Sequence, residues 1–559
     1  MIVEPGWLSL LPPLLAILMA LIFREVVISL FAGIWLGALV LAGYDPVAAT
    51  LRSVDTHMLG ALTGDGDKIA IIMFSLLLGG MVGVMSRSGG TLGIVETLGP
   101  HASTPRRGLF FTWLSGIIIF FDDYANTLIV GNTMRPVTDR LKISREKLAY
   151  VVDSTAAPMA AIAVISTWVG FEISLIGESL NAAAAQSTDA AAAEAIRAAA
   201  ANPFNVFLHS IPFLFYPILA LIFVLLTVTT RRDFGPMLRA EVRARTGGGL
   251  LAPGAMPAAD VEGGIMVPPP GKPHRWSNAG IPVLAVIATA LAGIWYTGSA
   301  AATEALGPGP HGITDVVGGA DPFSTLIWAS FVGVVVAMGL AVAQGILNIR
   351  EAVEAWLGGM RAMLLAVVIL VLAWGLGDIT EAMGTGAYLS GILADTLPMF
   401  LLPLLVFIVA ALISFATGSS WGTMAILFPV VIPLAVAMGA GVGFEQGDYT
   451  ILLGVISSVM AGSIFGDHCS PISDTTVLSS MASACDHVDH VRTQLPYAVT
   501  VAVVAMLLGD LGTALGLHPA IALGAGVAVL WGILRFVGRP AMEVVAERRP
   551  EDPVPARPA

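Results

Sequence analysis

Two adjacent carboxylates, Asp122 and Asp123, lie inside an apolar stretch that runs from Gly108 to Val137. Amide and hydroxyl side chains, Asn126 and Thr127, follow them in the sequence FFDDYANT. One carboxylate at the centre of a bilayer helix costs about 2.5–3.5 kcal/mol, so a pair must be neutralised by a cation, a proton, a partner charge or water. Two close carboxylates also cannot both ionise cheaply. The pair can therefore bind either a proton or a cation, and this competition is a sufficient chemical basis for ion exchange across a membrane.

Three further groups of polar residues fall within predicted spans, and in one of them, Gly466–Thr476, Gly, Pro and hydroxyl residues indicate a broken helix. Hydroxyls, carboxylates and the carbonyls of broken helices suit a cation such as Na⁺, and helix C-termini add partial negative charge. We therefore expect all four groups to meet in one midplane site. The candidate cation- and proton-binding residues are Asp122, Asp123, Asn126, Thr127, Asp153, Ser154, Thr155, Asp467, His468, Ser470, Ser473 and Asp474. A second polar tip is formed by Thr417, Gly418, Ser419, Ser420 and Thr423.

The composition predicts an all-α polytopic membrane protein. Of the 559 residues, 56% are hydrophobic and 12% are charged, and the mean hydropathy is +0.85. Soluble domains carry about 25% charged residues, and apolar runs long enough for about eleven full spans recur along this chain. The net charge of −12 and the scattered basic residues argue against nucleic acid as a partner. No pattern indicates an enzyme, a cofactor or a metal other than a transported Na⁺.

Basic residues orient the predicted spans, because short cytoplasmic loops collect Lys and Arg. Arg106 and Arg107 precede the FFDDYANT segment, and Arg135 and Arg140 follow it, so both of its flanks are expected on the cytoplasmic side. A simple span cannot satisfy this, whereas a re-entrant hairpin over residues 108–136 can. Arms of about 12 residues reach about 18 Å, a little over half of the hydrocarbon core, which places the two carboxylates near the midplane.

The second half of the chain repeats this order with opposite orientation. A second re-entrant hairpin is predicted over residues 399–438, entering from outside because acidic residues, Asp395, Glu445 and Asp448, flank it. Inverted repeats with broken helices at the midplane are typical of secondary transporters. The predicted units are a first repeat at 1–230, a flexible cytoplasmic linker at 231–279, a second repeat at 280–512, an extra terminal helix at 513–537 and a cytoplasmic tail at 538–559. The N-terminus is expected outside.

Five motifs resemble one known family. They are FFDDYANT, Asp153–Pro158, Ser166–Glu172, Ser419–Thr423 and Phe465–Thr476. Together they are similar to the NhaC-type Na⁺/H⁺ antiporters of the ion transporter superfamily, over nearly the whole chain except the linker, the alanine-rich loop and the tail. The resemblance implies a bacterial inner-membrane antiporter that exchanges Na⁺ for H⁺, surrounded by lipid, homodimeric and of elevator type.

Two alternative functions stay open. The family also contains exchangers of organic anions similar to malate/lactate antiporters, so a Na⁺- or H⁺-coupled exchanger of a small organic anion or amino acid is the main alternative. No arginine is predicted at membrane depth to bind a carboxylate, which favours inorganic ions. A gated channel is the alternative of another class, although titratable midplane acids argue against it. The sequence Cys485–His490 is rich in metal-binding residue types but lacks tetrahedral-site spacing, so we interpret it as a solvated cytoplasmic loop.

Overall fold

The computed structural model confirms the nearly all-helical class. It describes residues 6–547 apart from 24, 64–65, 99–100, 188–189, 258–267, 308, 310–311, 313–315, 317–319, 386–387, 389–391, 393–396 and 440–448. Within these residues the strands of the single sheet, β1 (Arg232–Asp233) and β2 (Arg539–Pro540), are two residues long and antiparallel. The acidic flanks expected for the second hairpin, Asp395, Glu445 and Asp448, lie outside the described residues.

The helices of the first half are α1 (Leu11–Phe23), α2 (Val26–Leu41), α3 (Pro46–Arg52), α4 (Gly60–Thr63), α5 (Gly66–Arg87), α6 (Gly90–Leu98), α7 (Pro105–Ile118), α8 (Asp123–Arg140), α9 (Arg145–Asp153), α10 (Ala157–Ile162), α11 (Val169–Gln186), α12 (Ala190–Ala200), α13 (Pro203–Ser210), α14 (Phe215–Thr230) and α15 (Gly235–Arg245). Those of the second half are α16 (Ser277–Leu306), α18 (Pro322–Ala343), α19 (Ile349–Ala362), α20 (Leu364–Ala382), α22 (Leu402–Thr417), α23 (Ser420–Gly439), α24 (Thr450–Cys469), α25 (Asp474–Ala482), α26 (His487–Val504), α27 (Leu511–Ala514), α28 (Pro519–Phe536) and α29 (Ala541–Glu547). Short 3-10 or π segments are η1 (Trp7–Leu10), η2 (Ser53–Leu59), η4 (Ile211–Phe213), η5 (Met399–Leu401) and η7 (Ala505–Asp510).

Membrane-spanning capacity is spread along both halves. Among the described residues, 9 helices are long and apolar enough to cross a membrane, and a tenth span results if the pair α13–η4 and α14, bent by 48°, crosses as one. Helix α7 is not among them: its 14 residues extend only about 21 Å at 1.5 Å per residue. Helix α22, together with η5, and helix α23 are each long and apolar enough to cross a membrane alone. The expected eleven spans and the re-entrant placement of both segments therefore stay predictions.

The chain reverses direction at the two carboxylates. Helix α7 ends at Ile118 and α8 begins at Asp123, and the two helices pack against each other. Gly108, near the start of α7, faces the side chain of Leu141, just beyond the end of α8. The turn forms because Asp122 adopts an extended backbone and its carboxylate caps α8 by accepting a hydrogen bond from Ala125 N. The carboxylates thus lie at the tip of an antiparallel helix pair.

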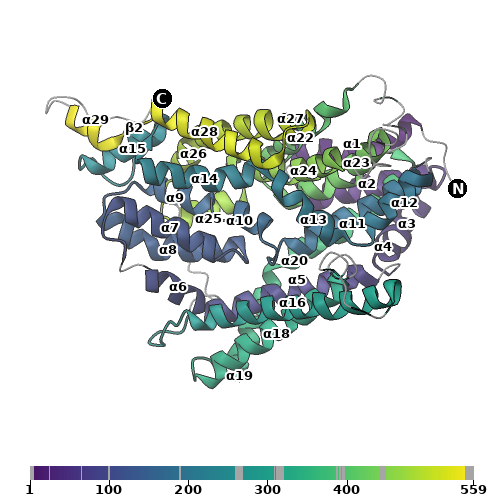
Figure 1. The fold of residues 1–559 in the computed structure, drawn as a ribbon, viewed down its shortest axis with the longest axis horizontal. Helices are drawn as coiled ribbons and strands as arrows, with labels where there is room; N and C mark the ends of the chain where they lie inside the picture. Colours follow the sequence, from purple (N-terminus) through teal and green to yellow (C-terminus); the bar gives the residue numbers. More distant parts are fainter. Residues whose placement is uncertain are drawn as a thin grey trace.

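A second break separates α24 from α25. Close packing of α22 along α24 stabilises this region. The two run parallel, because Pro403 faces Gly454 and, further along, Ala411 faces Gly466. At Gly466 an added Cβ would overlap the Ala411 carbonyl, so only glycine permits this approach. The contact aligns the end of α22 with the break between α24 and α25. In Figure 1, helices α5, α16, α18 and α19 form a separate layer at the bottom, while α7–α10, α14 and α22–α28 lie above it.

Part of the segment predicted to be a flexible linker is folded onto the helices above that layer. β1 pairs with β2, and α15 packs against α9, α26 and α29. Two ion pairs fix this contact: Arg243 Nη2 lies 2.8 Å from both carboxylate oxygens of Glu146, and Lys147 Nζ lies 2.7 Å from Asp233 Oδ1. All four side chains are buried. The amino-terminal third of the segment is therefore a docking element for α9.

The substitution Arg243→Met should destabilise the protein by about 3–5 kcal/mol, because it leaves a buried carboxylate without its partner. Burial raises the pKa of the Glu146 carboxyl above its usual value, and Arg243 opposes that rise. Without Arg243 the folded state binds a proton more readily than the unfolded state, so the loss should grow as the pH increases. Thermal unfolding in detergent at pH 5 and pH 8 measures both effects.

The matched control is Arg350→Met, because Arg350 forms a pair with Glu354 in which both side chains are exposed. Such pairs contribute little, so the control should shift stability by less than about 1 kcal/mol. Equal losses in the two variants would contradict the docking role of α15.

Candidate functional site

The tip of the α7–α8 pair carries a buried carboxylate without a partner. Asp122 and Asp123 are 4% and 2% exposed. Asp122 Oδ1 accepts a hydrogen bond of 2.7 Å from Ala125 N, whereas neither carboxylate oxygen of Asp123 has a hydrogen-bond partner among the described residues. Thr127 Oγ1 donates to the backbone carbonyl of Asp123 at 2.8 Å, so its hydroxyl is used within the helix. The two acids are therefore treated differently by the fold.

Asn126 ties this tip to the next broken helix. Its Nδ2 lies 2.8 Å from Gly116 O and 2.8 Å from Thr155 O, in the break between α9 and α10. The approach is close, because a Cβ on Gly116 would overlap the Thr155 hydroxyl. Asn126 Oδ1 is buried and accepts no hydrogen bond from any described residue. The expected proximity of the first two polar groups is present in the structure.

The segment before α11 completes the surroundings of the carboxylates. Thr167 N donates to Phe121 O at 3.0 Å, and the side chains of Thr167 and Trp168 lie beside Asp122 and Asp123. Thr167 Oγ1 and Trp168 Nε1 are also buried and unpaired within the described part of the chain. Several unpaired buried polar groups at one place call for an ion or water. The unpaired oxygens among them, those of Asp123, Asn126 and Thr167, can bind a cation, whereas Trp168 Nε1 can only donate.

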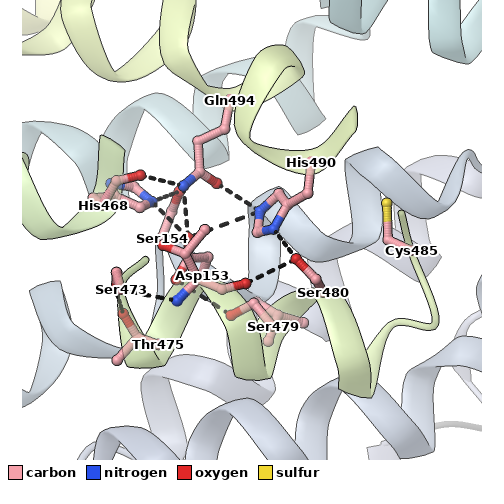
Figure 2. A network of polar contacts seen from close by, with 12 residues as sticks. Asp153, Ser154, His468, Ser473, Thr475, Ser479, Ser480, Cys485, His490 and Gln494 are labelled. Atoms are coloured by element: carbon pink, nitrogen blue, oxygen red, sulfur yellow. Dashed lines mark hydrogen bonds and ion pairs between the residues drawn. The ribbon is translucent and has the colours of Figure 1, made fainter. Parts of the chain in front are cut away.

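A second carboxylate, Asp153, has every oxygen occupied by protein groups (Figure 2). Gln494 Nε2 donates to Oδ2 at 2.6 Å, and the hydroxyls of Thr476 and Ser479 donate at 3.1 and 3.2 Å. His490 Nε2 lies 3.8 Å from Oδ2. These partners come from α25 and α26. The carboxylate therefore joins three helices that are distant in sequence.

His468, at the end of α24, belongs to the same network. Its Nε2 lies 3.0 Å from Ser154 Oγ and 3.7 Å from Asp153 Oδ2, and its Nδ1 lies 2.7 Å from the hydroxyl of Tyr216. Its carbonyl accepts a hydrogen bond of 2.6 Å from Gln494 Nε2. His468 is therefore a hydrogen-bonded histidine at the break between α24 and α25.

The candidate residues that flank His468 in the sequence mostly stabilise the break between α24 and α25. Thr475 Oγ1 donates to Asp467 Oδ2 at 3.2 Å, and Ser470 Oγ donates to Phe415 O at 2.8 Å. Ser473 caps α25 by accepting from Thr476 N. Asp474 is the first residue of α25, and its side chain lies outside what the structure describes.

The hydroxyls of the second tip are satisfied within it or by α24. Thr417 and Thr423 donate to carbonyls one turn earlier, and Ser420 Oγ donates to Ser463 O at 3.3 Å. Ser419 Oγ accepts from Gly422 N. Gly418 has φ of +67° and packs against Ile472 O. This tip approaches the first through Trp421, whose ring lies 5.3 Å from that of Trp168. The hydroxyls of this tip are therefore already hydrogen-bonded, and the tip contributes packing rather than oxygen atoms that are free to bind a cation.

Sequence reasoning missed several residues of these networks: Tyr216, Ser479, His490 and Gln494. Thr476 and Glu172 stood within the quoted motifs but were not among the candidate binding residues, and Glu172 is a fully buried acid whose oxygens have no partner in the described chain. His490 was placed in a solvated loop, but it is fully buried within α26. The spacing of His490 and Gln494 offered a signal, since residues four apart share one helix face.

An apolar cavity of about 600 Å³ borders the first tip. Its walls include Phe120 from the tip, Met159 from α10, Phe204 from α13, Leu291 from α16 and Leu326 from α18. It therefore separates the helices that carry the polar networks from the α16–α18 pair of the lower layer.

Comparisons with known proteins point to one family. A model of the Na⁺/H⁺ antiporter family matches residues 159–512. An uncharacterised protein of Haemophilus influenzae is 33% identical over 503 residues, covering 88% of each chain. The malate-2H⁺/Na⁺-lactate antiporter of Bacillus subtilis is 32% identical over 190 residues, covering 32% of this chain and 36% of the relative. The crystal structure of the YdaH transporter of Alcanivorax borkumensis has a similar fold, with a TM-score of 0.55 at 17% identity, covering 83% of this chain and 89% of that one.

The substitution Asn126→Leu should lower stability by about 1–3 kcal/mol, because it removes the amide that donates to the carbonyls of Gly116, Ile119 and Thr155. Thermal unfolding in detergent measures the loss. Asn205→Leu is the control, since Asn205 is half-buried on α13, and it should change stability by less than about 0.5 kcal/mol. No difference between the two variants would show that Asn126 does not hold the tip against the α9–α10 break.

Proposed function

Because this chain belongs to the Na⁺/H⁺ antiporter family, we propose that it exchanges cytoplasmic Na⁺ for external H⁺ across a bacterial inner membrane. One observation carries the proposal. A buried carboxylate, Asp123, has no protein partner among the described residues, and it lies at the tip of a broken helix pair. A membrane protein retains such a group when an ion or a proton neutralises it.

Na⁺ is proposed to bind between Asp123 and its unpaired neighbours. Asp123 offers a carboxylate, Asn126 its Oδ1 and Thr167 its Oγ1, all buried and free of partners within the described residues. Asp123 and Asn126 are three residues apart on α8 and so share one face. The C-terminal end of α7 points into the same break and adds partial negative charge. Oxygens of this kind at a helix break are a common Na⁺ site in transporters.

Protons are proposed to compete with Na⁺ at this pair of acids. Asp122 and Asp123 are adjacent and buried, so both cannot be charged at once without a cation between them. Na⁺ binding would then displace a proton, and proton binding would displace Na⁺. Asp153 is assigned to protons and not to Na⁺, because its oxygens already accept hydrogen bonds from Gln494, Thr476 and Ser479.

Alternating access is proposed to move the helices that carry the tips relative to the α5, α16, α18 and α19 layer, as the family resemblance implies for an elevator. The apolar cavity beside Phe120 supports this, because its apolar walls separate α10 and α13 from α16 and α18. A homodimer held through the unmoving layer follows from the same resemblance.

A small organic anion is the second candidate substrate. The cavity favours it, since it lies next to Phe120 and could hold an apolar group, and one relative is named a malate-2H⁺/Na⁺-lactate antiporter. Among the described residues, the lining includes no basic side chain to bind a carboxylate. A dye-based ΔpH assay with Na⁺, Li⁺, K⁺, malate, lactate and amino acids separates the two functions.

The substitution Asp123→Asn should abolish Na⁺-dependent proton movement in everted vesicles, since it removes the exchangeable charge but keeps the size. Dequenching of a pH-sensitive dye after Na⁺ addition measures this. Retention of full activity would remove the acid pair from the mechanism.

Thr167→Val should raise the half-saturating Na⁺ concentration about tenfold, because the loss of one oxygen ligand costs about 1.4 kcal/mol of binding. The control is Thr138→Val, because the Thr138 hydroxyl is buried but donates only to carbonyls of its own helix. Titration of the initial rate with Na⁺ compares them. An unchanged half-saturation in Thr167→Val would exclude this hydroxyl as a ligand.

A further inference from the structure

Two histidines at the start of α26 meet at one serine hydroxyl. Ser480 Oγ lies 2.9 Å from His487 Nδ1 and 2.8 Å from His490 Nδ1. Ser480 and His490 are fully buried, whereas His487 is partly exposed. Figure 2 shows His490 and Ser480 beside Asp153. The three side chains therefore form a line that leads from the surface to the buried carboxylate.

The Nε2 atoms of both rings, which do not face Ser480, must carry hydrogen. Gln494 Nε2 faces two acceptors, Asp153 Oδ2 and the His468 carbonyl, so the other end of the amide, Oε1, faces His490. Because Oε1 can only accept, His490 Nε2 donates to it over 3.0 Å. In the same way, His487 Nε2 lies 2.6 Å from the carbonyl of Pro471 and must donate to it.

The Nδ1 atoms of His487 and His490 both face Ser480 Oγ, which carries a single hydrogen. If both rings are neutral, each Nδ1 is an acceptor, and Ser480 can donate to only one of them. The other Nδ1 lone pair faces the lone pairs of Oγ. The hydroxyl also lies 2.8 Å from Thr476 O, which can only accept, and this competes for the same hydrogen. The cluster therefore has room for at least one proton more than two neutral rings carry.

One charge near His490, that of Asp153, favours such a proton, whereas burial and the two neighbouring histidines oppose it. Asp153 on α9 faces it, with Oδ2 3.8 Å from Nε2, and the other titratable groups near it are His468 on α24 and His487 on its own helix. Asp153 is the acidic group among these. A proton on His490 would thus be held by a carboxylate that needs a counter-charge at depth.

We propose that His487, Ser480 and His490 form a proton relay that connects the aqueous side at the start of α26, predicted to be cytoplasmic, with Asp153. The proposal rests on the exchange function given above. It assigns to these residues the passage of protons, separate from the binding of Na⁺ at Asp123.

Each transfer along the relay conserves hydrogen. The proton on His490 Nδ1 moves to Ser480 Oγ while the hydroxyl hydrogen moves to His487 Nδ1. His490 is then neutral, Ser480 again carries one hydrogen, and His487 is the cation. His487 then releases to water the proton that it has gained, and the reverse sequence returns a proton to His490 Nδ1, where Asp153 is its counter-charge.

Transport by Ser480→Ala and His487→Gln gives the first test. Both should lower the Na⁺-driven proton flux in proteoliposomes by at least about tenfold, the lower range for loss of a positioned proton-transfer group. The half-saturating Na⁺ concentration should change less than about twofold, because Na⁺ binding is not involved. His209→Gln is the matched control, since His209 is bonded only to a carbonyl of its own helix and its flux should be unchanged. Unchanged flux in both relay variants, each eluting as a monodisperse peak, would overturn the proposal.

Nitrogen-15 NMR of labelled histidine gives a test that does not depend on transport. In the wild-type protein His487 and His490 should titrate as a linked pair that shares a proton, and Ser480→Ala should uncouple them. Independent titration of the two rings in the wild-type protein would overturn the relay. If the wild-type protein moves no protons in response to Na⁺, the exchange function fails, while the linked titration still decides whether the proton is shared.

Discussion

The cost of burying a carboxylate away from water governs the arrangement of this protein. Asp153 and Asp123 are both almost fully buried, and the fold neutralises them in opposite ways. Asp153 receives donors from α25 and α26, which draws three helices together. Asp123 receives no hydrogen bond from the described residues, and we propose that an exchangeable ion or proton neutralises it. The hydrogen bonds of Asp153 hold helices together, whereas the oxygens of Asp123 stay unpaired in the described chain.

Helix ends make this division possible. Asp123 is the first residue of α8 and Asp153 the last of α9, and a continuous helix would place its backbone polar groups out of reach of other residues. Asn126 connects one break to the next by donating to the carbonyls of Gly116 and Thr155. Glycines such as Gly466 bring the neighbouring helices close enough for the breaks to align. The site is therefore built from backbone ends, and the side chains complete it.

Local chemistry made parts of this structure predictable. The breaks at Asp122 and after Cys469 follow from acids, Pro and hydroxyl residues inside apolar runs, and both are present, whereas the break after Asp153 was not predicted. The resemblance to the antiporter family also proved correct. What failed depends on partners distant in sequence. A basic, Gly- and Pro-containing segment predicts flexibility, but α15 is folded because Arg243 and Asp233 meet charges on α9. His490 was taken as solvated, since nothing local indicates that Asp153 lies beside it.

The pairing of β1 with β2 has a consequence for biosynthesis. β1 lies at residues 232–233 and β2 at 539–540, so the second strand is made roughly 300 residues later, about 15–60 s at ordinary rates of translation. Arg232 also donates to the carbonyls of Arg535 and Gly538, which are synthesised equally late. During this time α15 has been synthesised, but α29, one of the helices that pack against it, has not. A chain that is cut short before its last helices leaves that surface open, where proteases that inspect new membrane proteins can reach it.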